Sequence, residues 1–158
     1  LNADIQNFRV DGGVISADIK QLNANTNWGD TAITSLAGKY QFSPTSMVLE
    51  NAVIQTKESV LNVDIRLAYP KGGLKDFINK VNLSVGLKPS SIGVSDLKKI
   101  IPNWKGKSIK LKGVIDGFVK DFSTQGVQIN HQNTIAGLDG KIKNIFDMDS
   151  RSIEVDLK

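Results

Sequence analysis

The chain has 158 residues, of which 40% are hydrophobic and 23% charged, and its formal net charge is +4. The length suits one domain, and lysines spread along the chain favour a solvated face over a nucleic-acid groove. The absence of cysteine excludes a disulfide scaffold, thiol catalysis and thiolate zinc sites. No apolar run approaches the roughly 18 residues of a membrane-spanning helix. Because the chain opens on Leu1 inside an alternating segment, we expect it to be an excerpt of a longer protein.

Alternation of apolar and polar residues, typical of a strand with one apolar face, recurs along most of the chain. It predicts about ten strands, near residues 5–10, 15–19, 32–42, 47–55, 61–69, 83–87, 109–119, 127–129, 134–142 and 153–157. The polar stretch 23–30 is expected to be a loop. The register of 47–55 stays undecided, because its apolar residues serve both faces of a strand.

Two short helices interrupt the strands. Leu74, Phe77, Ile78 and Val81 are spaced as one stripe of a helix. A second helix is expected to begin at an N-cap Ser95 and to end before Pro102, and it is too short to stand without packing on the sheet or plugging an end of it. No long helix separates successive strands, so antiparallel neighbours are favoured over βαβ units.

The apolar strand faces carry more aliphatic side chains than two short helices can cover. The long ribbon 109–119, with Gly113 and Gly117 on its apolar face, is the clearest example. Either the sheet curls until this face packs on itself, or something apolar from outside occupies it. With only 6% aromatic residues, the face resembles an acyl-chain trough more than a sandwich core. The two glycines are expected to let the sheet bend or to leave room for a guest.

Catalysis finds no support in the sequence. The aspartates in strands sit between apolar neighbours and are expected on the wet face as solubilising residues: Asp4, Asp18, Asp64, Asp116 and Asp156. His131 is the single histidine, so a metal site or a nucleophile–base pair has no companion. We expect no enzyme activity, no cofactor and no metal.

Internal similarity is loose. Leu1 to Ile5 returns as Leu61 to Ile65, with a weaker echo at 81–85, and the unequal intervals indicate repetition of strands rather than a solenoid.

A family resemblance is carried by K-L-K-G-V-I-D-G at 110–117, by T-I-A-G-L-D-G-K-I-K-N-I at 134–145 and by the closing I-E-V-D-L-K. Together with F-R-V-D-G-G-V-I-S-A-D-I-K at 8–20 and V-S-D-L-K-K-I-I-P at 94–102, the chain resembles the TamB branch of the AsmA-like family, in the form found in Bacteroidota. The likeness covers essentially the whole chain and consists of strand rhythms rather than a signature.

The resemblance implies a mainly β fold, with long antiparallel strands in a curved open sheet or half-tube and about two short helices. It implies a non-enzymatic segment of a periplasmic lipid-transport conduit, anchored in the inner membrane and supporting outer-membrane biogenesis. Phospholipid and an outer-membrane Omp85-type barrel protein are the implied partners. The helices depart from a pure half-tube and are expected to cap or cover the groove. The expected lipid-binding inner face comprises Ile15, Ala17, Ile19, Leu61, Val63, Ile65, Leu67, Leu83, Val85, Leu87, Ile109, Leu111, Ile115, Ile153, Val155 and Leu157.

An alternative left open is a scaffold module that pairs its sheet edges with a β-barrel partner. A closed lipocalin-like carrier fits less well, because nothing in the sequence marks a closure.

Overall fold

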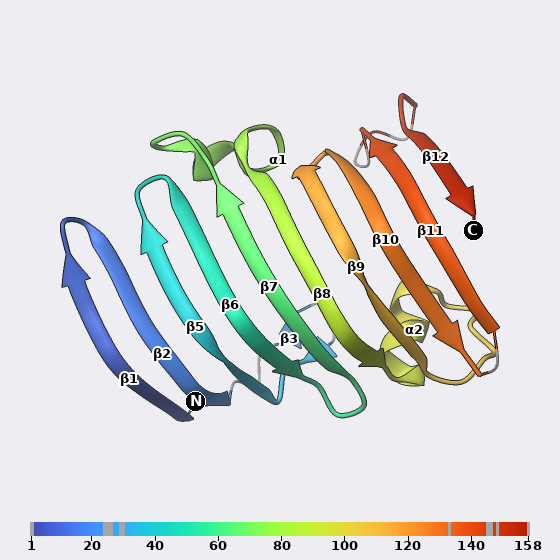
Figure 1. The fold of residues 1–158 in the computed structure, drawn as a ribbon, viewed down its shortest axis with the longest axis horizontal. Helices are drawn as coiled ribbons and strands as arrows, with labels where there is room; N and C mark the ends of the chain where they lie inside the picture. Colours follow the sequence, from blue (N-terminus) through green and yellow to red (C-terminus); the bar gives the residue numbers. More distant parts are fainter. Residues whose placement is uncertain are drawn as a thin grey trace.

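A computed structural model describes residues 2–23, 27–28, 31–132, 134–144, 147 and 149–157. Ten strands form one antiparallel sheet in the order β1-β2-β5-β6-β7-β8-β9-β10-β11-β12, and β3 pairs with β4 as a separate short ribbon (Figure 1). The strands are β1 (Asn2–Asp11), β2 (Val14–Asn23), β3 (Asn27–Trp28), β4 (Thr31–Ala32), β5 (Ser35–Ser43), β6 (Ser46–Gln55), β7 (Val60–Ala68), β8 (Asn82–Ile92), β9 (Ile109–Phe118), β10 (Asp121–His131), β11 (Thr134–Lys143) and β12 (Ser152–Leu157). The helices are η1 (Gly73–Asp76), α1 (Phe77–Lys80) and α2 (Val94–Ile100).

The sheet is a single open layer. Within the described residues, β1 pairs only with β2 and β12 only with β11, so the sheet has two free edges. Figure 1 shows α1 and α2 at opposite ends of the strands, which leaves the middle of both faces without a covering helix. The accessible surface is 10442 Å², whereas a compact monomer of this mass would expose about 7,800 Å². The expected open sheet is confirmed. The alternative, in which the sheet curls until its apolar face packs on itself, is not observed among the described residues.

No helix among the described residues has the length and apolarity to cross a bilayer.

β-Bulges interrupt the strand pairing at equivalent positions of β6 and β10. Asn51 in β6 and Gly126 in β10 have positive φ of 49° and 58°, and each lies where the ladder gains an extra residue. Their backbone N–H groups donate to Asp64 on β7 and Asp139 on β11, each at 2.6 Å. A bulge bends its strand and strengthens the local twist, so these two positions help to curve the sheet.

A glycine on the preceding strand completes this bulge–aspartate motif. Gly38 on β5 lies against the bulge of β6, and Gly113 on β9 lies against that of β10. Thirteen residues separate the glycine from the bulge residue and the bulge residue from the aspartate in both copies, which are 75 residues apart. This motif differs from the recurrence of Leu1 to Ile5 at Leu61 to Ile65 in the sequence: Asp64 closes a bulge, whereas Asp4 accepts a hydrogen bond from the Gln6 side chain.

The bulge in β6 explains why the register of 47–55 could not be decided. Met47 and Leu49 lie on the apolar face before the bulge, and Ile54 lies on it afterwards. One inserted residue moves the apolar-face residues from odd-numbered to even-numbered positions. A search for strict alternation along the strand therefore fails to assign one face to all of them.

The helices and the loop 23–30 differ from expectation. Gly93, not Ser95, is the N-cap of α2, and the cap has no side-chain hydrogen bond. In the predicted stripe of the first helix only Val81 is buried, and Leu74, Phe77 and Ile78 are exposed. Part of the expected loop forms β3, and residues 24–26 and 29–30 lie outside the described residues.

Gly113 and Gly117 do not leave room for a guest. A Cβ at Gly113 would lie 2.6 Å from the Cα of Val127, and one at Gly117 would lie 2.5 Å from the carbonyl oxygen of Asp121. Because the missing side chains let β10 approach closely, the space is already filled by the neighbouring strand.

Candidate functional site

An apolar groove on one face of the sheet is the strongest candidate site. Its volume is about 610 Å³, within the range of roughly 300–1,000 Å³ typical of small-molecule pockets. It lies over the first five strands of the sheet and the segment leading into β5, and no charged side chain lines it. The lining residues are Ile5, Phe8, Ile15, Ala17, Ile19, Ile33, Leu36, Tyr40, Met47, Leu49, Ile54, Ile65 and Leu67.

The apolar face continues past the groove across the whole sheet. Residues directly opposite one another in a ladder share a face, so cross-strand pairs can be followed from edge to edge. One such row takes one residue from each of the ten strands: Val10, Ile15, Phe42, Met47, Leu67, Leu83, Gly117, Phe122, Ile142 and Ile153. The groove is therefore one end of a longer apolar band.

The structure brings the predicted inner-face residues to one side of the sheet. Ile15, Ala17, Ile19, Ile65 and Leu67 line the groove itself. The ladder places the others on the same face beyond or beside it: Leu61, Val63, Leu83, Val85, Leu87, Ile109, Leu111, Ile115, Ile153 and Val155. Leu157 lies opposite Leu138 in the β11–β12 ladder, and its side chain lies outside the described residues. Lipid binding by these residues stays a prediction.

Several groove residues were absent from the predicted set. Met47, Leu49 and Ile54 belong to the strand whose register the bulge obscured. Ile5 and Phe8 fell in a predicted strand, but their uneven spacing spans another bulge, at Asn7, whose φ is 52°. The sequence shows that these residues are apolar and lie in strands, but it does not show on which face of the sheet each one lies.

The hydroxyl of Thr124 is a polar group within the apolar band. Thr124 on β10 lies between Ile115 and Gly140 in a cross-strand row, and its buried hydroxyl has no hydrogen-bond partner among the described residues.

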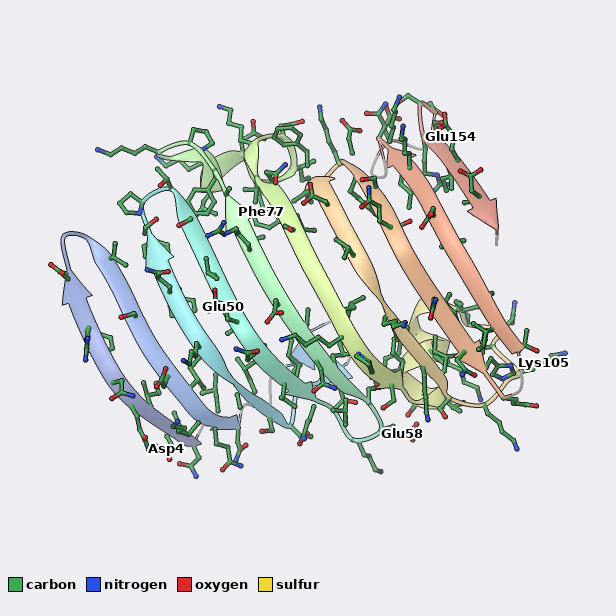
Figure 2. The ribbon with its side chains drawn as sticks, viewed as in Figure 1. Asp4, Glu50, Glu58, Phe77, Lys105 and Glu154 are labelled. Carbon is green, nitrogen blue, oxygen red and sulfur yellow. The ribbon has the colours of Figure 1, made fainter. Side chains whose placement is uncertain are left out.

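The opposite face of the sheet is polar. Figure 2 shows side chains bearing nitrogen and oxygen distributed over the strands, with Glu50 near the middle. Lys88 donates to Asn51 at 2.8 Å and forms an ion pair with Asp64 at 2.9 Å. The hydrogen bond from Lys88, with that from the N–H of Asn51, holds the pKa of Asp64 below its ordinary value. The strand aspartates thus do more than solubilise the face, because Asp64 and Asp139 also satisfy bulged backbone.

Polar contacts fasten α2 to the turn between β6 and β7. Ser59 is buried, accepts from the N–H of Gly93 at 3.0 Å and donates to Asp96, which also accepts from Thr56. Burial alone would raise the pKa of Asp96, but the bonds from Ser59 and Thr56 and the charge of Lys99 leave it below its ordinary value. The helix is therefore fixed at one end of the sheet rather than laid over the groove.

Glu58 adds a second contact to the same junction. Hydrogen bonds from the side chain and backbone of Ser95 lower the pKa of Glu58. The residue expected to cap the helix is thus itself held by the β6–β7 turn.

The described residues contain no cluster of three or more His, Asp or Glu side chains that could hold a metal ion. His131 lies at the end of β10, where its Nε2 accepts from the N–H of Lys107 and its ring meets Trp104 edge-on. These two contacts join the loop after α2 to the end of β10.

Comparisons with family models, with curated proteins and with solved structures gave no match for this chain.

Proposed function

We propose that this chain is a non-enzymatic segment of a lipid conduit whose apolar face shields phospholipid acyl chains. The observation that carries the proposal is the groove of thirteen lining residues without a charged side chain, on a sheet that no second layer covers in the part of the chain that the structure describes. A contiguous exposed apolar surface of this kind marks an interaction site. Its location in the periplasm, between the inner and the outer membrane, is part of the proposal and rests on the sequence resemblance to TamB-like proteins.

The two faces of the sheet suit this task. Acyl chains need only apolar, non-directional contact, which aliphatic side chains supply along the whole band. Lys, Asp and Glu on the opposite face keep the other side of the single layer in water. The polar head groups of a bound lipid would stay at the open side of the groove.

The experiment pairs adjacent substitutions on the two faces of β7. Ile65→Asp places a carboxylate in the groove, where acyl contact must desolvate it, whereas Arg66→Asp places the same group on the exposed polar face. Binding of a fluorescent fatty acid to the purified chain is expected to weaken at least tenfold for Ile65→Asp and less than twofold for Arg66→Asp. The organic extract of the unmodified chain, examined by mass spectrometry, is expected to contain phospholipid.

Circular dichroism of both variants separates loss of binding from loss of the fold. If Ile65→Asp unfolds the chain, Leu49→Asn at the neighbouring groove position supplies a milder test. An unmodified chain that binds no fatty acid and carries no lipid contradicts the proposal.

The free edges support a second candidate function, a scaffold that adds strands to a β-barrel partner. Ile5, Phe8 and Val10 on β1 are each more than half exposed, and β12 exposes Ile153 and Val155. Unpaired edge backbone is a template for strand addition. Photo-crosslinkers placed on β1 and β12 would capture protein rather than lipid under this alternative. Under the first proposal they would capture no partner protein.

A further inference from the structure

A single short stretch has a larger positive net charge than the whole chain. Residues 94–112 contain six lysines and one aspartate, which gives this stretch a net charge of +5. The remaining residues, with 14 basic and 15 acidic side chains, sum to −1. The lysines are therefore clustered, contrary to the expectation drawn from their spread along the strands.

The fold gathers this stretch at one end of the sheet. It comprises α2, the loop that follows and the start of β9, and Figure 2 shows Lys105 at this end, beyond the strands. Lys98, Lys105, Lys107 and Lys110 are exposed. The described salt bridges join Lys88 to Asp64 and Lys99 to Asp96, so one lysine of the six is in an ion pair.

The loop after α2 has a fixed shape. The indole N–H of Trp104 donates to the carbonyl of Lys107 at 3.0 Å, and the N–H of Lys107 donates to His131 at 3.1 Å. Beside it, Lys107, Ser108, Lys110, Asn130 and Gln132 line an open cleft of about 490 Å³ with no carboxylate among them. Ammonium, hydroxyl and amide groups together suit the phosphate oxygens of a head group.

An exposed apolar residue, Ile101, lies among the lysines of residues 94–112. Ile101, at the C-cap of α2, is 46% exposed and is followed by Pro102. Exposed apolar residues flanked by lysines are typical of segments that rest in the interface of an anionic bilayer. Nucleic-acid recognition fits less well, because the stretch has no arginine and the ring of its one aromatic residue, Trp104, is engaged with His131.

We propose that residues 94–112 form a docking surface for an anionic lipid surface, so that the end of the sheet carrying α2 meets the membrane. This inference does not depend on acyl chains in the groove. Lysines on this end would attract the head groups, and Ile101 would enter the interface between them.

The test measures sedimentation of the full chain with vesicles of phosphatidylcholine alone and of phosphatidylcholine mixed with phosphatidylglycerol. Binding is expected only to the anionic vesicles, and it is expected to weaken as salt rises. The test variant replaces Lys98, Lys105, Lys107 and Lys110 with Gln. The matched control makes the same change of net charge elsewhere, at Lys20, Lys39, Lys141 and Lys143.

The test variant is expected to lose on the order of 100-fold in affinity for the anionic vesicles, and the control less than fivefold. The test variant should still bind the fluorescent fatty acid, and Ile65→Asp should still bind the vesicles, which separates this surface from the groove. Equal losses for the two lysine variants overturn the proposal, as does equal binding to neutral vesicles. Tighter binding to single-stranded RNA or to free inorganic phosphate than to the anionic vesicles also overturns it.

Discussion

Substituting Gly113 with alanine tests whether strand β9 needs a glycine where it meets the bulge of β10. Gly113 has φ +147°, and an added Cβ would lie 2.6 Å from both the Cα and the Cγ2 of Val127. A backbone conformation that only glycine adopts readily costs another residue about 1–3 kcal/mol, and overpacking adds about 1–3 kcal/mol. After a gain of about 0.4–1 kcal/mol from the less flexible unfolded chain, we expect the free energy of unfolding to fall by about 1–6 kcal/mol.

Gly86 provides the matched control on the adjacent strand. A Cβ at Gly86 would meet nothing within 4 Å, so Gly86→Ala is expected to change the free energy of unfolding by less than about 1 kcal/mol, in the stabilising direction. Gly38, the equivalent of Gly113 in the other copy of the motif, would bring a Cβ to 3.0 Å from the Cα of Ala52, so its substitution should fall between the two.

Urea denaturation followed by circular dichroism measures all three variants under the same conditions. The expected order of destabilisation is Gly113, then Gly38, then Gly86. If Gly113→Ala and Gly86→Ala have the same midpoint and slope, the close approach of β10 to Gly113 is not what requires glycine there.

Two further predictions concern the polar contacts. Because the folded pKa of Asp64 is lowered, its contribution is present above the ordinary value near 3.8 and is lost as pH falls through the folded value. Asp64→Asn should therefore destabilise the chain at about pH 7, by less than about 1 kcal/mol because the ion pair is half exposed. At about pH 2 the destabilisation should be much smaller. If the urea midpoints of the variant and the unmodified chain differ equally at both pH values, the prediction is contradicted. Ser59→Ala removes the acceptor of the Gly93 N–H and should cost about 1–3 kcal/mol. It should also speed tryptic cleavage within α2, and an unchanged cleavage rate would show that the junction does not hold the helix.

Local sequence patterns were enough to locate the strands of the main sheet. The alternation around Leu61 to Leu67 is a property of neighbouring residues, and the structure has β7 where it was predicted. The ribbon 109–119 became β9 with its alternation intact, because β9 itself contains no inserted residue. The excess of apolar strand faces over helices left two alternatives, a face packed on itself and a face covered from outside, and the structure shows an open sheet.

The contents of the groove and the capping of α2 needed the fold. Met47, Leu49 and Ile54 share a face only because a bulge lies between them, and that bulge is closed by Asp64 from the next strand. Ser95 is a residue type favoured at N-caps, yet the β6–β7 turn supplies Glu58 as its partner. Such partners are distant in sequence, so no window around Ser95 or Asn51 contains them.

The amino-acid sequence by itself determined the approximate number of strands in the main sheet, the preference for antiparallel neighbours and the alternation of apolar and polar residues along most strands, because these depend on neighbouring residues and on the length of the connections. Only the tertiary structure decided which apolar residues meet in the groove, where the sheet bends and how the lysines of 94–112 come to share one end of it. Bulges explain the difference. A single inserted residue reverses the facing of all that follows on its strand, and whether that residue can be accommodated depends on the glycine and the aspartate of the neighbouring strands.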